Sequence, residues 1–243
     1  MLLEIAGLRK SFGSIVVADD FDISIAPGEA VGIIGPNGAG KTTLFNLIAG
    51  GLSPDAGAIL FEGRDVTPLP PQARCRAGIG RTHQIPQPFE KLTVFENLLV
   101  GAVHGRGKTE REKTEHAVAQ SCGEILATLD LLKHANTLAG ALTLLQRKRL
   151  EMARALATNP RLLLLDEIAG GLIEAECSQL VDTIRDIRRS GVAILWIEHV
   201  VHALLAVVDR LVVLNFGRKI AEGDPREVMR SPEVRQIYIG IEA

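Results

Sequence analysis

The run Gly35–Thr42 constrains this chain more than any other part of its sequence. It reads G-P-N-G-A-G-K-T and matches the pattern G-x-x-x-x-G-K-[S/T] in full. An apolar segment typical of a strand, Ala30–Ile34, precedes it, and an apolar helical segment, Lys41–Gly50, follows it. The alternative is a glycine-rich turn that binds nothing. The flanking strand and helix disfavour that alternative and indicate a phosphate site.

Each residue type in this run has a chemical role. Glycines let the backbone bend, so that successive N–H groups and the start of the helix face phosphate oxygens. Lys41 is expected to reach the β and γ phosphates, and the Thr42 hydroxyl to bind Mg²⁺. The sequence therefore predicts that a nucleoside triphosphate binds at Gly35, Pro36, Asn37, Gly38, Ala39, Gly40, Lys41, Thr42 and Thr43.

A second signal is an acidic turn after the leucine-rich segment Leu162–Leu165. In sheets of parallel strands, ligands bind beyond the carboxyl ends of the strands, where Asp166 and Glu167 would lie. Asp166 is expected to hold Mg²⁺ through its water shell, and Glu167 to orient or deprotonate an attacking water. Alone, a strand with an acidic turn is commonly structural, but next to a phosphate site it favours hydrolysis.

The remaining pattern predicts an α/β fold with a helical insertion. Apolar strands alternate with helices after Arg161, which indicates a mainly parallel sheet with helices on both faces. The segment Pro68–Pro88 is expected to be loops around a strand at Gly78–Thr82, and Gly105–His116 a solvated loop and helix start. The other expected strands and helices are Leu2–Ile5, Val16–Ile25, Ala58–Glu62, Ala175–Arg189, Val192–Ile197, His199–Val207 and Leu211–Leu214.

The insertion is expected to cover about residues 84 to 145 and to contain an amphipathic helix. Val118, Cys122, Ile125, Leu129 and Leu132 recur at spacings of three and four, which places all five on one helix face. Cys122 is therefore interpreted as a core residue rather than a reactive thiol.

Composition excludes several classes of protein. The chain has 27 basic and 29 acidic residues, a net charge of -2, so nothing attracts it globally to nucleic acid. Its 3 cysteines form neither a zinc pattern nor a disulfide framework, which favours a reducing compartment. No apolar run is long enough to cross a bilayer or to serve as a signal peptide. The hydrophobic fraction of 47% suggests surface that a partner covers.

Together these motifs resemble the ATP-binding subunit of ABC transporters. The resemblance rests on GPNGAGKTT, on Gln84 after a short strand, on LLLLDE, and on Glu198 with His199 after a strand, and it extends from Ile5 to Gly240. Other segments resemble the branched-chain amino acid importer subfamily. These segments are FNLIAG, GIGRTHQ, LTVFENLLVGA and GRKIAEGDPREVMRSPEVRQIYIG.

The resemblance implies a single ABC ATPase domain over residues 1–243 with an N-terminal antiparallel β part. Residues 1–83 and 146–243 would form the P-loop NTPase core with this β part, and residues 84–145 the helical subdomain. Gln84 would complete the Mg²⁺ and water shell, His199 would contact the γ-phosphate, and the Phe12 ring would stack on adenine. The histidine pair His199 and His202 is a weak metal site, because a third ligand is missing.

The resemblance also implies partners and a location. The chain would bind ATP and Mg²⁺, pair with a second ABC ATPase subunit and contact integral membrane permease subunits, while a periplasmic binding protein delivers the solute. It would lie peripherally at the cytoplasmic face of the inner membrane. Two other interpretations stay open: a soluble ABC ATPase not tied to transport, and a regulatory subunit that hydrolyses weakly. The solute and the choice between homodimer and heterodimer are not determined by the sequence.

The chain departs from the family pattern where one subunit meets the other subunit's ATP. The family's L-S-G-G-Q signature is replaced by Leu142–Gln146, in which Thr143 keeps a hydroxyl that could reach a γ-phosphate. Leu144 and especially Leu145 are expected to obstruct that phosphate, because leucine is bulkier and less free in φ than glycine. Leu145→Gly is then expected to raise activity.

The turn after Glu167 departs as well. Ile168 replaces the usual proline, and Ile173 stands where a polar residue normally crosses the interface. The residues that would bind ATP within this chain are thus intact, while those that would contact the ATP of the partner subunit are altered. If the chain pairs with a different ATPase subunit, this pattern predicts an asymmetric dimer in which one of the two ATP sites turns over and the other mainly holds nucleotide. In a homodimer both sites would be compromised.

Overall fold

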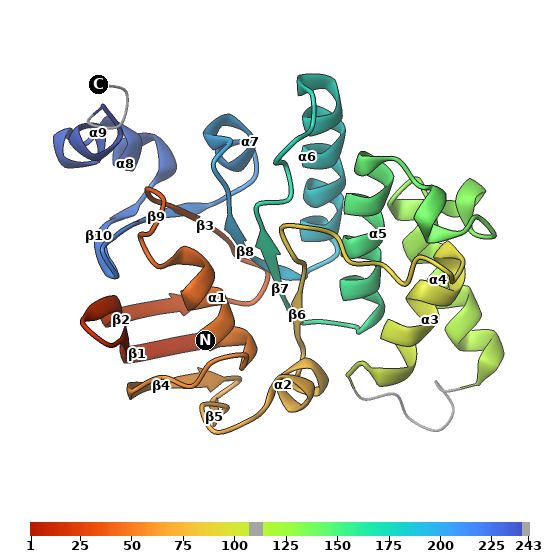
Figure 1. Ribbon diagram of the computed structural model, residues 1–243, viewed down its shortest axis with the longest axis horizontal. Helices are drawn as coiled ribbons and strands as arrows, with labels where there is room; N and C mark the ends of the chain where they lie inside the picture. Colours follow the sequence, from red (N-terminus) through yellow and green to blue (C-terminus); the bar gives the residue numbers. More distant parts are fainter. Residues whose placement is uncertain (107–113, 240–243) are drawn as a thin grey trace.

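Six strands form the large sheet at the centre of the computed structural model, which describes residues 1–106 and 114–239 (Figure 1). They lie in the order β10-β9-β3-β8-β7-β6, and all neighbours are parallel except β10 and β9. The strands are β3 (Ala30–Ile34), β6 (Ile79–Arg81), β7 (Leu162–Asp166), β8 (Ala193–Ile197), β9 (Arg210–Asn215) and β10 (Arg218–Gly223). The predicted parallel sheet is confirmed.

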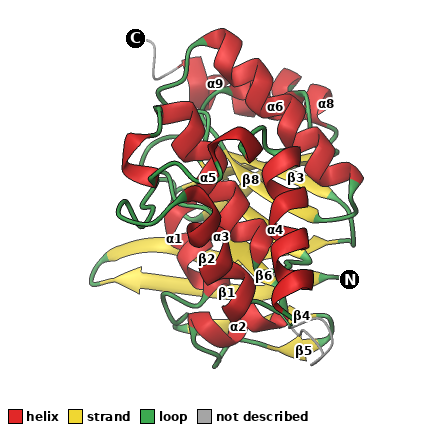
Figure 2. Ribbon diagram, turned by 90° about the vertical axis from the view of Figure 1, so that its right-hand side faces the viewer, coloured by secondary structure: helices red, strands yellow, loops and turns green. Residues whose placement is uncertain are grey.

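Helices and a second sheet cover the two faces of the large sheet. Every residue of β3, β7 and β8 is buried, as continuous apolar strands require when both faces are covered. One face packs against α1 (Lys41–Ala49), and the other against α6 (Glu174–Arg189) and α7 (Val201–Leu205). The stripe predicted for α6, Leu180, Ile184 and Ile187, is buried. Figure 2 shows β3 and β8 of the large sheet between α6 and α1.

The N-terminal strands form a separate antiparallel sheet in the order β2-β1-β4-β5. They are β1 (Leu3–Phe12), β2 (Ile15–Ile25), β4 (Ala56–Phe61) and β5 (Arg64–Asp65). The first strand is longer than the apolar run that predicts it, because it continues through the β1–β2 hairpin to Phe12. This sheet lies over α1 and shares its apolar core.

The helical part consists of α3 (Val94–His104), α4 (Glu115–Thr128), α5 (Leu144–Ala157) and two short 3-10 turns, 132–134 and 139–141. These helices pack beside one another at the end of the large sheet formed by β6 (Figure 1). The division at residue 145 falls in the first turn of α5, which contacts α3 and α4, and it stays a prediction. Of the predicted loop 105–116, residues 107–113 lie outside the described chain.

The expected apolar stripe of α4 is correct at four of its five positions. Cys122 and Leu129 are fully buried, Val118 is nearly so, and Ile125 packs partly against the core. Leu132 is wrong, because its side chain is 54% exposed. The helix ends at Thr128, and Asp130 then adopts a left-handed φ of 52°, which turns the chain away from the helix axis.

Within Pro68–Pro88 the strand predicted at Gly78–Thr82 is confirmed as β6, but the loop predicted before it is wrong, because Pro71–Ala77 forms α2. Proline occupies its first position and Gly78 its C-terminal cap, which are ordinary helix boundary signals. The buried Arg74 guanidinium donates to the carbonyls of Leu47 and Ile48 at the end of α1 and so fixes α2 there. Two C-terminal helices, α8 (Pro225–Arg230) and α9 (Pro232–Ile239), complete the described chain. None of its helices is both long and apolar enough to cross a membrane.

Candidate nucleotide site

Four neighbouring parallel strands end at one edge of the large sheet, and each is followed by a predicted site residue. Strand β3 leads into the glycine-rich turn, β8 into Glu198 and His199, β7 into Glu167, and β6 into Gln84. Since carboxyl ends of parallel strands meet at the same edge, the strand order itself brings these residues together.

Close backbone packing explains two glycines of the turn, Gly35 and Gly40. A Cβ on Gly35 would lie 2.1 Å from the Leu214 carbonyl oxygen, and one on Gly40, where φ is 101°, would lie 2.2 Å from that of Val17. The N–H of Gly217, in the β9–β10 turn, donates to Ala39 at 2.9 Å. The turn is therefore held from both sides by the β1–β2 and β9–β10 hairpins, and only glycine fits at these two contacts.

Lys41 is buried at the start of α1. Its ammonium donates to the carbonyls of Gly35 and Pro36 at 2.7 and 3.0 Å. Burial lowers the pKa of Lys41, while the nearby carboxylates of Glu167 and Asp166 act in the opposite direction. The first N–H groups of α1 have no partner within the helix and no capping side chain. This end of α1 thus combines free donors, a positive dipole end and a cation, the combination that binds phosphate.

Glu167 connects the ends of three strands. Its Oε2 accepts a hydrogen bond from Gln84 Nε2 at 2.5 Å, and its Oε1 lies 2.7 Å from His199 Nε2. A carboxylate only accepts, so His199 must carry its proton on Nε2. The Glu167 side chain is mostly shielded from solvent, whereas His199 is nearly half exposed. Of the three residues predicted for hydrolysis, Gln84 and His199 therefore each contact Glu167 directly.

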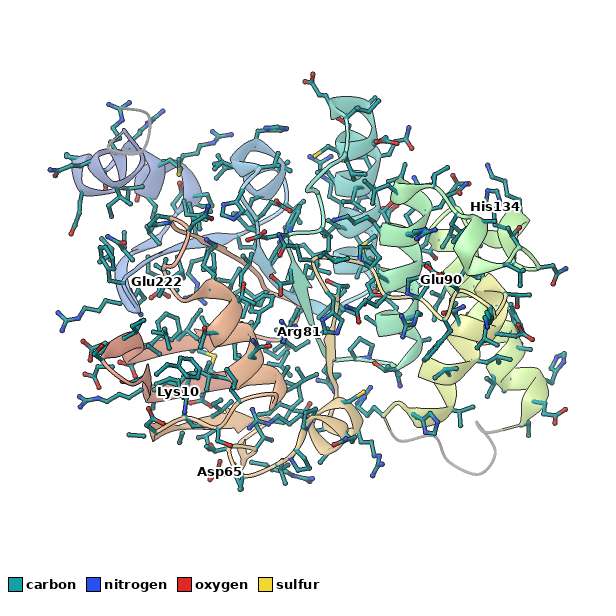
Figure 3. All side chains as sticks on the ribbon, in the orientation of Figure 1. Lys10, Asp65, Arg81, Glu90, His134 and Glu222 are labelled. Atoms are coloured by element: carbon teal, nitrogen blue, oxygen red, sulfur yellow. The ribbon has the colours of Figure 1, made fainter. Side chains whose placement is uncertain are left out.

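Asp166 is buried and paired with a residue that the sequence analysis missed. Arg81 Nη2 donates to Asp166 Oδ2 at 2.9 Å, while Arg81 Nη1 donates to Asn46 Oδ1 at 2.6 Å. Figure 3 shows Arg81 beside β6, in the middle of the molecule. Asn46 belongs to α1, so the guanidinium links the helix after the turn to the acidic end of β7. An arginine three residues before Gln84, at the end of a short strand aimed at this edge, was the available signal.

The site residues fit a bound Mg²⁺. The second carboxylate oxygen of Asp166, Oδ1, is buried and has no hydrogen-bond partner in the described residues. A buried, unpaired carboxylate oxygen is costly without a cation or a water to receive it. Thr42, exposed at the start of α1, and Gln84 would supply the other oxygen ligands, and oxygen is what Mg²⁺ prefers.

Two predicted nucleotide residues lie outside this cluster. Phe12 is half exposed at the end of β1, where Lys10 Nζ lies 5.5 Å from the centre of its ring. Thr143 caps α5, and its Oγ1 accepts from the Gln146 backbone N–H. Both residues are exposed, and both roles stay predictions.

The two leucines of the altered signature differ in exposure. Leu145 is only 9% exposed and faces the interior, while Leu144 is 44% exposed. Both belong to the first turn of α5, where φ is helical, so the absence of glycine causes no strain. Leu144 therefore replaces Leu145 as the candidate obstruction. Ile173 is 67% exposed at the start of α6, and Ile168 is fully buried.

The fold and the turn after β3 define the class of P-loop nucleotide-binding ATPases. A family model described as ABC transporter matches residues 18–170. The chain belongs to the ABC transporter family, as an ATPase subunit of a transporter. A second model, described as branched-chain amino acid ATP-binding cassette transporter, matches residues 218–243.

Relatives of two different functions are equally similar to this chain. One is the lipopolysaccharide export system ATP-binding protein LptB of Acidithiobacillus ferridurans, which is 36% identical over 98% of this chain and 97% of its own. The other is the high-affinity branched-chain amino acid transport ATP-binding protein LivG of Escherichia coli K12, which is 36% identical over 98% of both chains.

A solved structure supports the same family and its nucleotide binding. The ADP conformation of MJ1267, an ATP-binding cassette of an ABC transporter, is 34% identical, with a TM-score of 0.88 over 98% of both chains. The fold predicted from the sequence is therefore confirmed.

Proposed function

We propose that this chain hydrolyses ATP at the cluster of Gln84, Glu167 and His199. The observation that carries the proposal is that one Glu167 carboxylate oxygen contacts Gln84 and the other contacts His199. This carboxylate lies near Lys41, at the start of α1. Lys41 and the N–H groups of α1 hold the β and γ phosphates, with the residues of the glycine-rich turn around them.

Glu167 is the base in this proposal. Its carboxylate orients the attacking water and takes a proton from it, while Gln84 fixes the carboxylate and the water through its amide. His199, which carries a proton on Nε2, donates to the γ-phosphate once Glu167 turns to the water. Thr42, Gln84 and Asp166 would hold Mg²⁺, which would supply positive charge near the phosphate oxygens. Lys41 leaves the carbonyls of Gly35 and Pro36 to meet the phosphate.

The test is Glu167→Gln, which keeps the shape and removes the base. We expect ATP turnover to fall about 100- to 10,000-fold, the range for loss of a general base. Binding of ATP, measured by calorimetry with Mg²⁺, should persist. The matched control is Glu115→Gln, an exposed glutamate on α4, which should leave turnover unchanged. Turnover by Glu167→Gln at the wild-type rate would refute the assignment.

We further propose that ATP hydrolysis here drives an importer of branched-chain amino acids or related small polar solutes. The match of residues 218–243 to the branched-chain model supports this, as does the similarity to LivG. The partners would be membrane permease subunits, a second ABC ATPase subunit and, indirectly, a periplasmic binding protein, at the cytoplasmic face of the inner membrane.

Uptake distinguishes this proposal from lipopolysaccharide export, which the similarity to LptB raises. Cells that lack the chain should lose accumulation of labelled leucine and regain it with the wild-type chain but not with Glu167→Gln. Normal uptake combined with loss of surface lipopolysaccharide would assign the chain to export.

We also propose that the dimer is asymmetric and contains a different ATPase subunit as partner. Leu144 and Ile173 support this, because they expose apolar side chains where the family offers glycine and a polar residue. Leu144 lies against the turn that leads to Ile173: a Cβ on Gly171, two residues before Ile173, would be 3.3 Å from Leu144 Cδ2. The chain alone should turn over ATP slowly and accelerate with its partner, and fast turnover alone would refute the asymmetry.

A further inference from the structure

A buried lysine on α5 holds two of the loops that carry the proposed catalytic residues. Lys148 is 3% exposed, and its ammonium donates to the backbone carbonyls of Gln84 and Glu167 at 3.1 and 3.3 Å. Both bonds go to the main chain and leave the side chains of Gln84 and Glu167 free for chemistry. The lysine therefore fixes where these two side chains start.

A buried glutamate holds the third loop. Glu198 is 2% exposed, and its Oε2 accepts from the Ala169 N–H at 3.0 Å. Its Oε1 accepts from the N–H groups of His199 and Val200 at 2.9 and 3.4 Å. One carboxylate thus ties the turn after Glu167 to the segment that presents His199.

These charges are expensive to bury and need a reason to be there. Lys148 lies one helical turn from Leu145 and Met152 on the inward side of α5, where apolar residues are expected. Burial lowers the pKa of Lys148, against the opposing fields of Glu198 and Glu167. An apolar side chain would avoid the desolvation cost but would leave the carbonyls of Gln84 and Glu167 without this donor.

Hydrogen bonds from neighbouring residues fix the backbone of Glu167 in an unusual conformation. Its φ is 46°, in the left-handed region that non-glycine residues rarely adopt. Its N–H donates to the Ile197 carbonyl at 2.9 Å and its carbonyl accepts from Lys148. Both peptide groups of this residue are therefore fixed by neighbours, which offsets the cost of the conformation and aims the carboxylate at Gln84 and His199.

We propose that Lys148 and Glu198 are positioning residues that together hold the backbone of Gln84, Glu167 and His199 in the geometry for hydrolysis. Lys148 also links this geometry to α5, the helix that begins with the exposed Thr143 and Leu144. A shift of α5 caused by a neighbouring subunit is thereby passed directly to the main chain of Glu167. This inference rests on the proposed roles of the three catalytic residues.

The test separates rate from binding. Lys148→Met keeps the length of the side chain and loses the charge and both bonds, so kcat should fall roughly 10- to 100-fold, as for a small misplacement of reacting groups. The affinity for ATP, measured by displacement of a fluorescent ATP analogue, should stay within about twofold. Lys148→Arg, which can still donate to both carbonyls, should restore most of kcat. The control is Lys133→Met at an exposed lysine, which should change neither quantity.

Glu198→Gln is the second variant and covers a failure of Lys148→Met to fold. Its amide nitrogen cannot accept the N–H groups that one Glu198 oxygen now accepts, so kcat should again fall while the affinity for ATP is kept. Wild-type kcat in both variants, or no recovery in Lys148→Arg, would overturn the inference. If these variants keep wild-type kcat while Glu167→Gln is inactive, only the positioning role fails. An active Glu167→Gln would instead refute the proposed function.

Discussion

The ion pair between Arg81 and Asp166 makes a quantitative prediction. The side chains are 14% and 4% exposed, so both charges depend on each other rather than on water. Removal of one partner from a buried pair costs about 3 to 5 kcal/mol, because the other charge stays buried. Proteins of about 150 to 250 residues lose roughly 2 to 4 °C per kcal/mol. We therefore expect Arg81→Met to lower the unfolding temperature by roughly 6 to 20 °C, as measured by calorimetry.

Two further variants test the reasoning. Arg189 pairs with Asp186 at 2.8 Å on the surface, with side chains 77% and 55% exposed, so Arg189→Met should cost less than about 1 kcal/mol. Combining Arg81→Met with Asp166→Asn removes both buried charges and should be less destabilising than Arg81→Met alone. The argument is refuted if Arg81→Met costs no more than Arg189→Met, or if the combined variant is the least stable of all.

Three other predictions follow from burial and charge. Burial lowers the pKa of Lys41 in the folded chain below its ordinary 10.5, so just below that pH the unfolded chain binds more protons and stability should rise with pH. Lys41→Met should reduce this slope in urea unfolding, and an unchanged slope would contradict the reasoning. Leu145→Gly should lose at least about 3 kcal/mol of unfolding free energy and Leu144→Gly only about 1, with equal losses contradicting the orientation of α5. Burial raises the pKa of Cys75, so iodoacetamide should modify it more slowly than a small free thiol at about pH 8, and an equal rate would show that the thiol is not shielded.

The parts of the site that could be predicted lie at ends of strands. Apolar runs ending in Ile34, Leu165 and Ile197 identify buried parallel strands, and the residues that follow must meet at one edge. That rule brings Glu167 and His199 together without any structure. It does not show which side chain touches which, because that depends on rotamers and on the loops between strands.

Residues that the sequence does not reveal as part of the site, such as Lys148, lie within a helix rather than at the end of a strand. Lys148 belongs to no motif that predicts a role for it, because its burial depends on how α5 packs against the loops of Gln84 and Glu167. Its spacing of three from Leu145 and four from Met152 was the available signal. The prediction that Leu132 is buried fails because the apolar periodicity of the sequence continues beyond the end of α4. The left-handed φ of Asp130, which turns the chain there, is visible only in the structure.

The grip on the glycine-rich turn has a consequence for how the protein matures. Val17 and Gly217 close around Gly40 and Ala39, although two hundred positions separate Val17 from Gly217. A nascent chain that has emerged from the ribosome only as far as the end of α6 contains the whole phosphate motif. It still lacks the β9–β10 hairpin, which packs against one side of that motif. We expect nucleotide to bind only after the β9–β10 hairpin has been synthesised. A chain truncated before this hairpin should therefore not bind ATP.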